Sequence, residues 1–203
     1  MLDLKYDIRD FQGLKKRFGK EGAQSVEKAL IWSTDRMASR AATYISKDLR
    51  STYAIKAREI KGHLKIHRVR RDPTRALLYT GKRLPLEQFS PKQRWVSVNP
   101  RRTVQSGPRK GKLARRRGVT VRVRKDKGRQ IVPGGWQAKN HILRRADQGD
   151  NASQPRIQYG PSVPGMVAHP ATIEGAQDLV RRELPKEFSG RLDYLLSKKM
   201  GQS

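Results

Sequence analysis

GVTVRVRKDKGRQIVPGGWQA, residues 118–138, is the stretch that decides the expected fold. Three valines alternate with threonine and arginine over residues 119–124, and a period of two directs one row of a strand into a core and the other into water. A turn at residues 125–128 leads into a second short strand at 130–132, which is followed by Pro-Gly-Gly. The sequence therefore predicts a hairpin that is apolar on one side and strongly cationic on the other.

Two long segments on either side of this hairpin have helical periodicity. One apolar stripe runs through residues 22–52, and a second runs from Ile173 to Leu195 across Pro185, which is expected to kink or split its helix. A second hairpin is expected where residues 63–70 turn back through 76–79. The predicted fold class is α+β, an antiparallel β-sheet of hairpins packed against a long N-terminal and a long C-terminal helix, with an extended basic loop.

Shorter elements complete this prediction: helical segments at residues 6–18 and 55–62, and strands at 94–98, 140–145 and 156–159. Residues 1–203 are predicted to form a single domain. Within it, residues 99–117 are poor in apolar side chains and rich in Gly, Pro, Arg and Lys. Such a segment buries too little surface to order itself, so a basic mobile arm or loop is expected there.

The composition is dominated by positive charge. The 203 residues include 46 Lys and Arg against 18 Asp and Glu, a formal net charge of +28. Such an excess repels itself in the compact state and indicates a polyanion or an acidic protein surface as a partner. No cysteine is present, which excludes disulfides and thiolate chemistry. No apolar run approaches the roughly 18 residues of a membrane span, so a cytoplasmic chain made without export and without membrane contact is expected.

No catalytic constellation is recognisable in the sequence. The few acidic residues in the middle of the chain fall in predicted turns or connections, and P-loop, GxSxG and HExxH motifs are absent. His63 and His67 would lie about 13 Å apart on one strand, too far to share a metal ion. The sequence therefore predicts a protein that is not an enzyme and has no catalytic residues, metal or cofactor.

Lys and Arg residues in a stretch with almost no Asp or Glu are the candidate contact for nucleic acid or for an acidic partner. Such side chains would contact phosphates by charge, with an affinity that falls steeply with salt. The alternative is a solvated surface. The series comprises Arg101, Arg102, Arg109, Lys110, Lys112, Arg115, Arg116, Arg117, Arg122, Arg124, Lys125 and Lys127.

Four segments, at residues 32–68, 81–89, 119–138 and 159–166, resemble the minor tail protein Z family of tailed phages, also called tail completion proteins. The likeness extends over about residues 22–200, and its most specific parts are GKRLPL, VPGGW and GPSVPGM. Residues that match these motifs are implied to be structural: Gly81, Leu84, Pro85, Leu86, Pro133, Gly134, Trp136, Gly160, Pro161, Ser162, Val163 and Pro164. The chain departs from the family's pattern in a long basic insertion before Val119 and in Trp136, where Phe is more usual.

The resemblance implies a structural virion protein that completes the head-proximal end of the tail and helps join tail to head at the neck. Implied partners are further copies in a ring, six-fold or a multiple of it, the tail terminator and tail tube, the head-side connector proteins and double-stranded DNA in the channel. It implies assembly in the host cytoplasm. Two alternatives stay open: a tail terminator ring protein, and a basic nucleic-acid-binding protein of ribosomal or nucleoid type.

Overall fold

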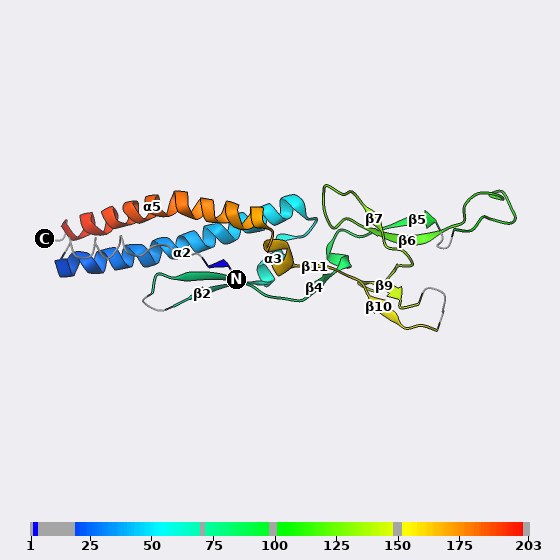
Figure 1. The fold of residues 1–203 in the computed structure, drawn as a ribbon, viewed down its shortest axis with the longest axis horizontal. Helices are drawn as coiled ribbons and strands as arrows, with labels where there is room; N and C mark the ends of the chain where they lie inside the picture. Colours follow the sequence, from blue (N-terminus) through cyan, green and yellow to red (C-terminus); the bar gives the residue numbers. More distant parts are fainter. Residues whose placement is uncertain (1, 4–18, 70–71, 98–100, 148–151, 201–203) are drawn as a thin grey trace. The chain divides into compact units, whose positions relative to one another are not determined.

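The computed structural model describes residues 2–3, 19–69, 72–97, 101–147 and 152–200, and its fold class is α+β, as predicted (Figure 1). The helix expected at residues 6–18 lies outside the described residues. The chain divides into two compact units. The helical unit comprises residues 1–48, 61–80 and 167–203, and the strand unit comprises residues 49–60 and 81–166. The described strands form four small sheets rather than one.

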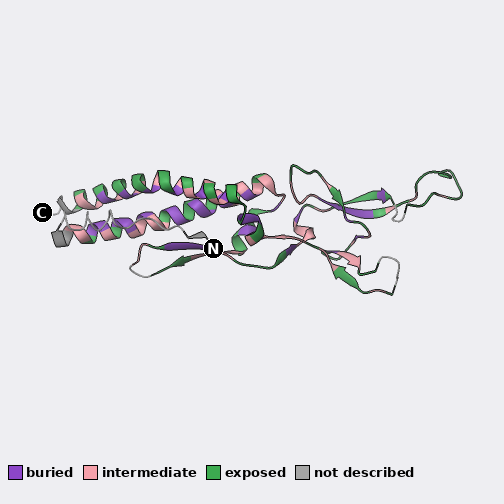
Figure 2. Cartoon of the chain, viewed as in Figure 1, coloured by how far each residue is buried: buried purple, intermediate pink, exposed green. Residues whose placement is uncertain are grey.

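Two long helices dominate the helical unit. They are α2 (Gly19–Thr52), whose last turn belongs to the strand unit, and α5 (Pro170–Met200). Val26, Ala29 and Leu30 of α2 form a buried cluster with Phe188 and Leu192 of α5. The two helices therefore pack directly on each other, with their buried sides facing inward and their exposed sides outward (Figure 2). This confirms both predicted stripes.

Pro185 lies inside α5, which continues through it, so the predicted split of the helix does not occur. A proline within a helix removes one backbone hydrogen bond and crowds the preceding turn. Here Leu184 before it and Phe188 after it are both buried, so packing holds the helical path on either side. Tertiary burial outweighs the local cost of the proline.

The helical unit also contains a small antiparallel sheet in the order β1-β3-β2. The strands β2 (Leu64–Arg68) and β3 (Arg75–Tyr79) form the predicted second hairpin, in a register that places Ile66 opposite Leu77. The strand β1 (Leu2–Asp3), which the sequence did not predict, pairs with the other edge of β3. Leu77 on the central strand is almost fully buried.

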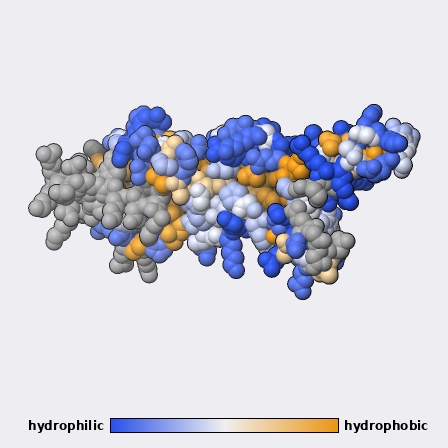
Figure 3. Space-filling model, turned by 45° about the vertical axis from the view of Figure 1, so that its right-hand side comes forward, coloured by the Kyte–Doolittle hydropathy of each residue, from blue (hydrophilic) through white to orange (hydrophobic). Residues whose placement is uncertain are grey.

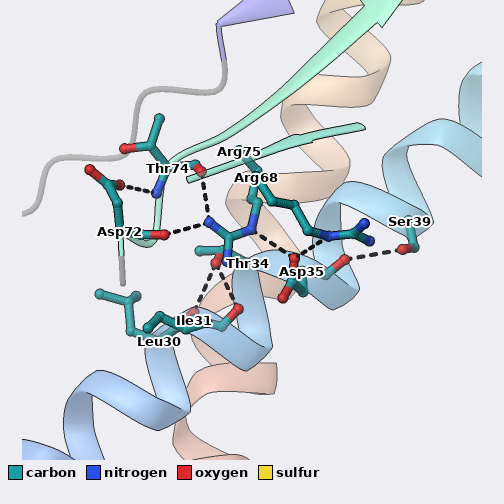
Figure 4. Close-up of polar contacts among 9 residues, drawn as sticks. All are labelled: Leu30, Ile31, Thr34, Asp35, Ser39, Arg68, Asp72, Thr74 and Arg75. Atoms are coloured by element: carbon teal, nitrogen blue, oxygen red, sulfur yellow. Dashed lines mark hydrogen bonds and ion pairs between the residues drawn. The ribbon is translucent and has the colours of Figure 1, made fainter. Parts of the chain in front are cut away.

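A polar network attaches this hairpin to α2 (Figure 4). Arg68 and Arg75 donate hydrogen bonds of 2.8 and 2.7 Å to the same carboxylate oxygen of Asp35. The side chain of Arg75 is only 4% exposed, and it also donates to the carbonyls of Asp72 and Thr74. Burial acts to raise the pKa of the Asp35 carboxyl, but the bonds and charges of Arg75 and Arg68 outweigh it and hold that pKa below its ordinary value.

The strand unit is built from short elements. In chain order they are α3 (Ala57–Gly62), β4 (Arg83–Pro85), the 3-10 helix η1 (Leu86–Gln88), β5 (Lys92–Ser97), β6 (Arg115–Val121), β7 (Gln130–Ile131), β8 (Trp136–Ala138), β9 (His141–Arg145), β10 (Pro155–Ile157) and β11 (Tyr159–Ser162), followed by α4 (Val163–Val167) at its boundary with the helical unit. The strands pair as β5-β6-β7, β10-β9-β8 and β11-β4.

The hairpin expected at residues 118–138 is present as β6 and β7, with Thr120 opposite Ile131. Its valines enter the core of the strand unit, where Val119, Val121 and Val132 cluster with Ile142. Thr120 was expected to face water but is 5% exposed, and its hydroxyl donates a 3.1 Å hydrogen bond to the carbonyl of Lys92. The longer partner of β6 is β5, in which Lys92 lies directly opposite Thr120.

Two of the segments that carry the family resemblance lie side by side in the structure. The strand β4 from GKRLPL pairs with β11 from the GPSVPGM region, with Tyr159 opposite Pro85. A Cβ on Gly160 would lie 2.7 Å from the ring of Phe89, a fully buried side chain, so this position has no room for any larger residue. The two motifs thus form one close-packed pair of strands.

Candidate functional site

The basic hairpin comprises β5, the described connection at residues 101–114, and β6. Its two strands pair over six residues, from Lys92 opposite Thr120 to Ser97 opposite Arg115. Since antiparallel residues directly opposite each other share one face, the register fixes which side chains lie together.

The connection continues this ladder beyond the named strands. Thr103 and Leu113 form a bridge, the amide of Val104 donates to the carbonyl of Lys112 at 2.9 Å, and the amide of Ala114 donates to Arg102 at 2.7 Å. The sequence predicted an arm unable to order itself. The described part instead has paired backbone groups, and Arg115 to Arg117 belong to strand β6. Backbone pairing supplies the order that apolar burial does not.

One face of β6 is cationic and exposed at its first half and apolar and buried at its second half. Arg115, Arg117, Val119 and Val121 are alternate residues and therefore share that face. The two valines are buried in the core of the strand unit, whereas the two arginines are exposed. The apolar half thus anchors the strand, and the cationic half presents charge to solvent.

Gly118 marks the change on the opposite face. Val96 of β5 packs over this glycine so closely that a Cβ there would lie 2.3 Å from one of its methyl groups. Arg116 points to this same face and is half-buried. Arg116 is therefore separated by strand alternation from Arg115 and Arg117, although the three are consecutive.

The structure divides the twelve predicted contact residues into two groups. Exposed side chains of the basic hairpin and its connection form the first group: Arg101, Arg102, Arg109, Lys110, Lys112, Arg115 and Arg117, with Arg116 half-buried beside them. The second group, Arg122, Arg124, Lys125 and Lys127, lies at and beyond the other end of β6. Figure 3 shows hydrophilic side chains over much of the visible face, interrupted by smaller hydrophobic patches.

Most of the second group makes contacts within the protein. The amide of Lys125 donates to the carbonyl of Thr52 at 2.8 Å, and its ammonium group donates to the carbonyl of Arg50. Lys125 therefore caps the end of α2, where helix carbonyls lack partners. Arg122 donates to the carbonyl of Lys125, and the hydrogen bonds between Arg124 and Asp126 raise the pKa of the arginine and lower that of the carboxyl.

Trp95, an exposed aromatic residue, lies beside the cations of the first group. The sequence predicted it to lie in a strand but gave it no functional role. Trp95 of β5 is 64% exposed and sits directly opposite Arg117, whose guanidinium carbon is 6.0 Å from the centre of the indole ring. The only sequence signal for this site was the alternation of Trp95 with Val96 along the strand, which places the two side chains on opposite faces. It became informative only when the register placed Arg117 across from it.

The matched motif residues have structural surroundings. Leu84 and Val163 are buried, while Gly81 and Gly134 adopt positive φ angles of 136° and 69°, which glycine tolerates best. Trp136 begins β8 and lies 5.7 Å from the guanidinium carbon of Arg145. Of the remaining motif residues, Pro85 ends β4 and Leu86 begins η1. Gly160, Pro161 and Ser162 lie on β11 and Pro164 lies in α4, while Pro133 lies in the connection between β7 and β8.

The strand unit also has a polar pocket of about 420 Å³ beside η1. Glu59, Glu87 and Gln88 contribute to its lining, and Glu87 accepts a 2.7 Å contact from the ring of His141. Among the described residues, no three His, Asp or Glu side chains are grouped so that they could hold a metal ion. His63, considered above as a ligand, instead contacts the carbonyl of Thr80 at 2.7 Å.

Comparisons of the chain with protein-family models, with curated proteins and with solved structures find no match. Within the part of the chain that the structure describes, no helix has an apolar stretch that would suffice to cross a bilayer.

Proposed function

We propose that this protein is a structural virion component that completes the head-proximal end of a phage tail and helps join it to the head. The sequence resemblance supports this assignment. The proposal assigns the protein no catalytic step, metal or cofactor, and it places copies of the chain in a ring, six-fold or a multiple of it, next to the tail terminator, the tail tube and the head-side connector.

The structural observation that best supports the proposal is that one half of β6 is buried in the core and the other half exposes arginines. A neck protein needs a fixed scaffold and a surface that meets a negatively charged neighbour. In this chain, buried valines anchor the strand, and exposed arginines continue from it into a connection rich in Arg and Lys. This surface is suited to DNA in the channel or to acidic neck proteins.

The test replaces Arg115, Arg116 and Arg117 together by serine in the phage. We expect normal folding, because two of these side chains are exposed and one is half-buried, and we expect fewer infectious particles. A matched control replaces Lys28, Lys61 and Lys65, three exposed cations of the helical unit, by serine. Equal particle yield and infectivity in the two triple variants would remove the proposed role of the basic hairpin.

Electron microscopy of labelled particles tests the location separately. The proposal expects the label at the neck. A label elsewhere, or a chain absent from the virion, would contradict the assignment. The terminator alternative predicts a label at the end of the tail tube in tails that have not yet met a head, whereas the ribosomal or nucleoid alternative predicts none in the virion.

A further inference from the structure

The outer end of the basic hairpin combines an exposed indole ring with two exposed arginines. Trp95 is 64% exposed, and the register places it opposite Arg117 and next to the pair formed by Ser97 and Arg115. These residues share one face of the two strands. Arg115 and Arg117 are two positions apart, so their Cα atoms are separated by about 7 Å along the strand.

The charge around this face excludes several kinds of partner. From Gln88 to Lys125 the sequence contains no Asp or Glu but 13 Lys and Arg. A second copy of the same face would bring like charge against like charge. A purely apolar partner would have to desolvate the arginines without compensation. The partner therefore carries negative charge.

The exposed indole ring distinguishes between two kinds of negatively charged partner, an acidic protein and a nucleic acid. An acidic protein surface satisfies the arginines but gives an exposed aromatic ring no specific counterpart. A nucleic acid with unpaired bases offers both, because phosphates pair with arginine and a base stacks on an aromatic ring. In a duplex the flat faces of the bases are covered by their neighbours, so only unpaired bases suit the ring.

We propose that the outer end of the basic hairpin binds single-stranded nucleic acid, with a base stacked on Trp95 and phosphates held by Arg115 and Arg117. This inference rests on the proposed function and narrows the negatively charged neighbour from DNA or acidic proteins to nucleic acid. The other two tryptophans provide internal controls. All three rings lie beside an arginine, at 4.7 Å for Trp32, 5.7 Å for Trp136 and 6.0 Å for Trp95, but Trp32 and Trp136 are half-buried whereas Trp95 is exposed.

The test measures binding of the full chain to a labelled oligo(dT) of about 20 nucleotides by fluorescence anisotropy. Trp95→Ala is expected to weaken binding roughly 5- to 150-fold, the range for loss of one stacked base, while Trp95→Phe retains most of the affinity. Trp136→Phe is the matched control and should leave the affinity unchanged. Circular dichroism verifies that each variant is folded.

The salt dependence of the affinity distinguishes the contribution of base stacking from that of phosphate contacts. The double variant Arg115→Ser/Arg117→Ser is expected to reduce the magnitude of the slope of log affinity against log salt by about 1.4, since each lost contact on a single strand contributes about 0.7. Trp95→Ala should leave that slope unchanged. A duplex of the same length should bind more weakly than oligo(dT), and its affinity should be insensitive to Trp95→Ala.

Three results would overturn the inference. The first is equal oligo(dT) affinity for Trp95→Ala and the parent chain, the second is tighter binding of the duplex, and the third is tighter binding of polyglutamate than of oligo(dT). Each of these leaves the neck assignment standing if the label lies at the neck and the triple arginine variant lowers infectivity. Conversely, oligo(dT) binding with the expected Trp95 dependence but without a neck label would retain the site and reject the proposed function.

Discussion

The helical unit and the strand unit contain similar numbers of basic residues but very different numbers of acidic ones. The helical unit has 22 Lys and Arg with 13 Asp and Glu, and the strand unit has 24 with 5, which gives net charges of +9 and +19. In the helical unit, cations meet carboxylates across elements: Arg36 and Arg40 of α2 both pair with Glu187 of α5, at 3.1 and 2.6 Å. In the basic hairpin no carboxylate is available in the sequence between Glu87 and Asp126.

This difference indicates two uses of the same residue type. Arginines of the helical unit stabilise the packing of one element on another, whereas those of the basic hairpin remain available to a partner. The strand unit must then owe its stability to its core and backbone pairing. Four substitutions and one pH dependence test this contrast.

The largest effect is expected for Phe89→Ala in the strand unit. The Phe89 side chain is fully buried and packs against Gly160, so its removal leaves a cavity that should lower the free energy of unfolding by about 3–5 kcal/mol. Urea denaturation measures the change. Ile131→Ala, at a site 54% exposed in the same unit, serves as the control and should cost far less. A loss below about 1 kcal/mol for Phe89→Ala would mean that the core does not stabilise this unit.

A smaller loss is expected for Asp35→Asn in the helical unit. The substitution leaves the buried guanidinium of Arg75 without its carboxylate, which should cost about 2–3 kcal/mol, less than in a fully buried pair because the Asp35 side chain is 36% exposed. The matched control is Asp126→Asn, whose partner Arg124 is more exposed. Equal losses in the two variants would remove the contrast between the units.

The same pair predicts a pH dependence. The pKa of Asp35 is lowered in the folded protein, so its stabilisation is fully present above the ordinary carboxyl value of 3.8 and is lost as the pH falls through the lower folded-state pKa. The parent chain should therefore lose stability in that acid range more steeply than Asp35→Asn does. Urea titrations at a series of acid pH values test the difference, and parallel acid limbs would contradict it.

The smallest effects concern two glycines with opposite expected signs. Gly118→Ala forces a methyl group against Val96 and should destabilise the strand unit by about 1–3 kcal/mol. Gly190→Ala, in an open position on α5, should stabilise the helical unit by up to about 1 kcal/mol through higher helix propensity. Thermal unfolding monitored by circular dichroism compares them. Stabilisation by Gly118→Ala would show that β5 and β6 separate at little cost.

Elements with strong local periodicity were predictable from the sequence. The stripe of α2, the β2–β3 hairpin and the inward valines of β6 follow from spacings of three to four or of two residues. The pairing of β4 with β11 was not predictable, because it joins segments more than 70 residues apart and has no local signal. The split that was expected at Pro185 does not occur, because residues on both sides of the proline are buried and the helix continues through it.

The candidate site was predictable in composition but not in arrangement. Charge alone identified the twelve cations, but only the register separates Arg116 from its two neighbours. Lys125 was selected as a contact residue, yet it caps α2 through carbonyls of Thr52 and Arg50, a role that depends on a distant helix end. Trp95 was missed because its partner Arg117 lies 22 positions further along the chain.

The position of Gly118 between the packed and the charged halves of β6 has a consequence for how this protein can diversify. Backbone pairing with β5 continues across Gly118 whichever side chains are present, so the described connection at residues 101–114 can change in length and composition without disturbing the buried valines. Exchange of this connection in related chains would therefore add or remove contacts beside Trp95, Arg115 and Arg117, while those three residues stay in place on β5 and β6.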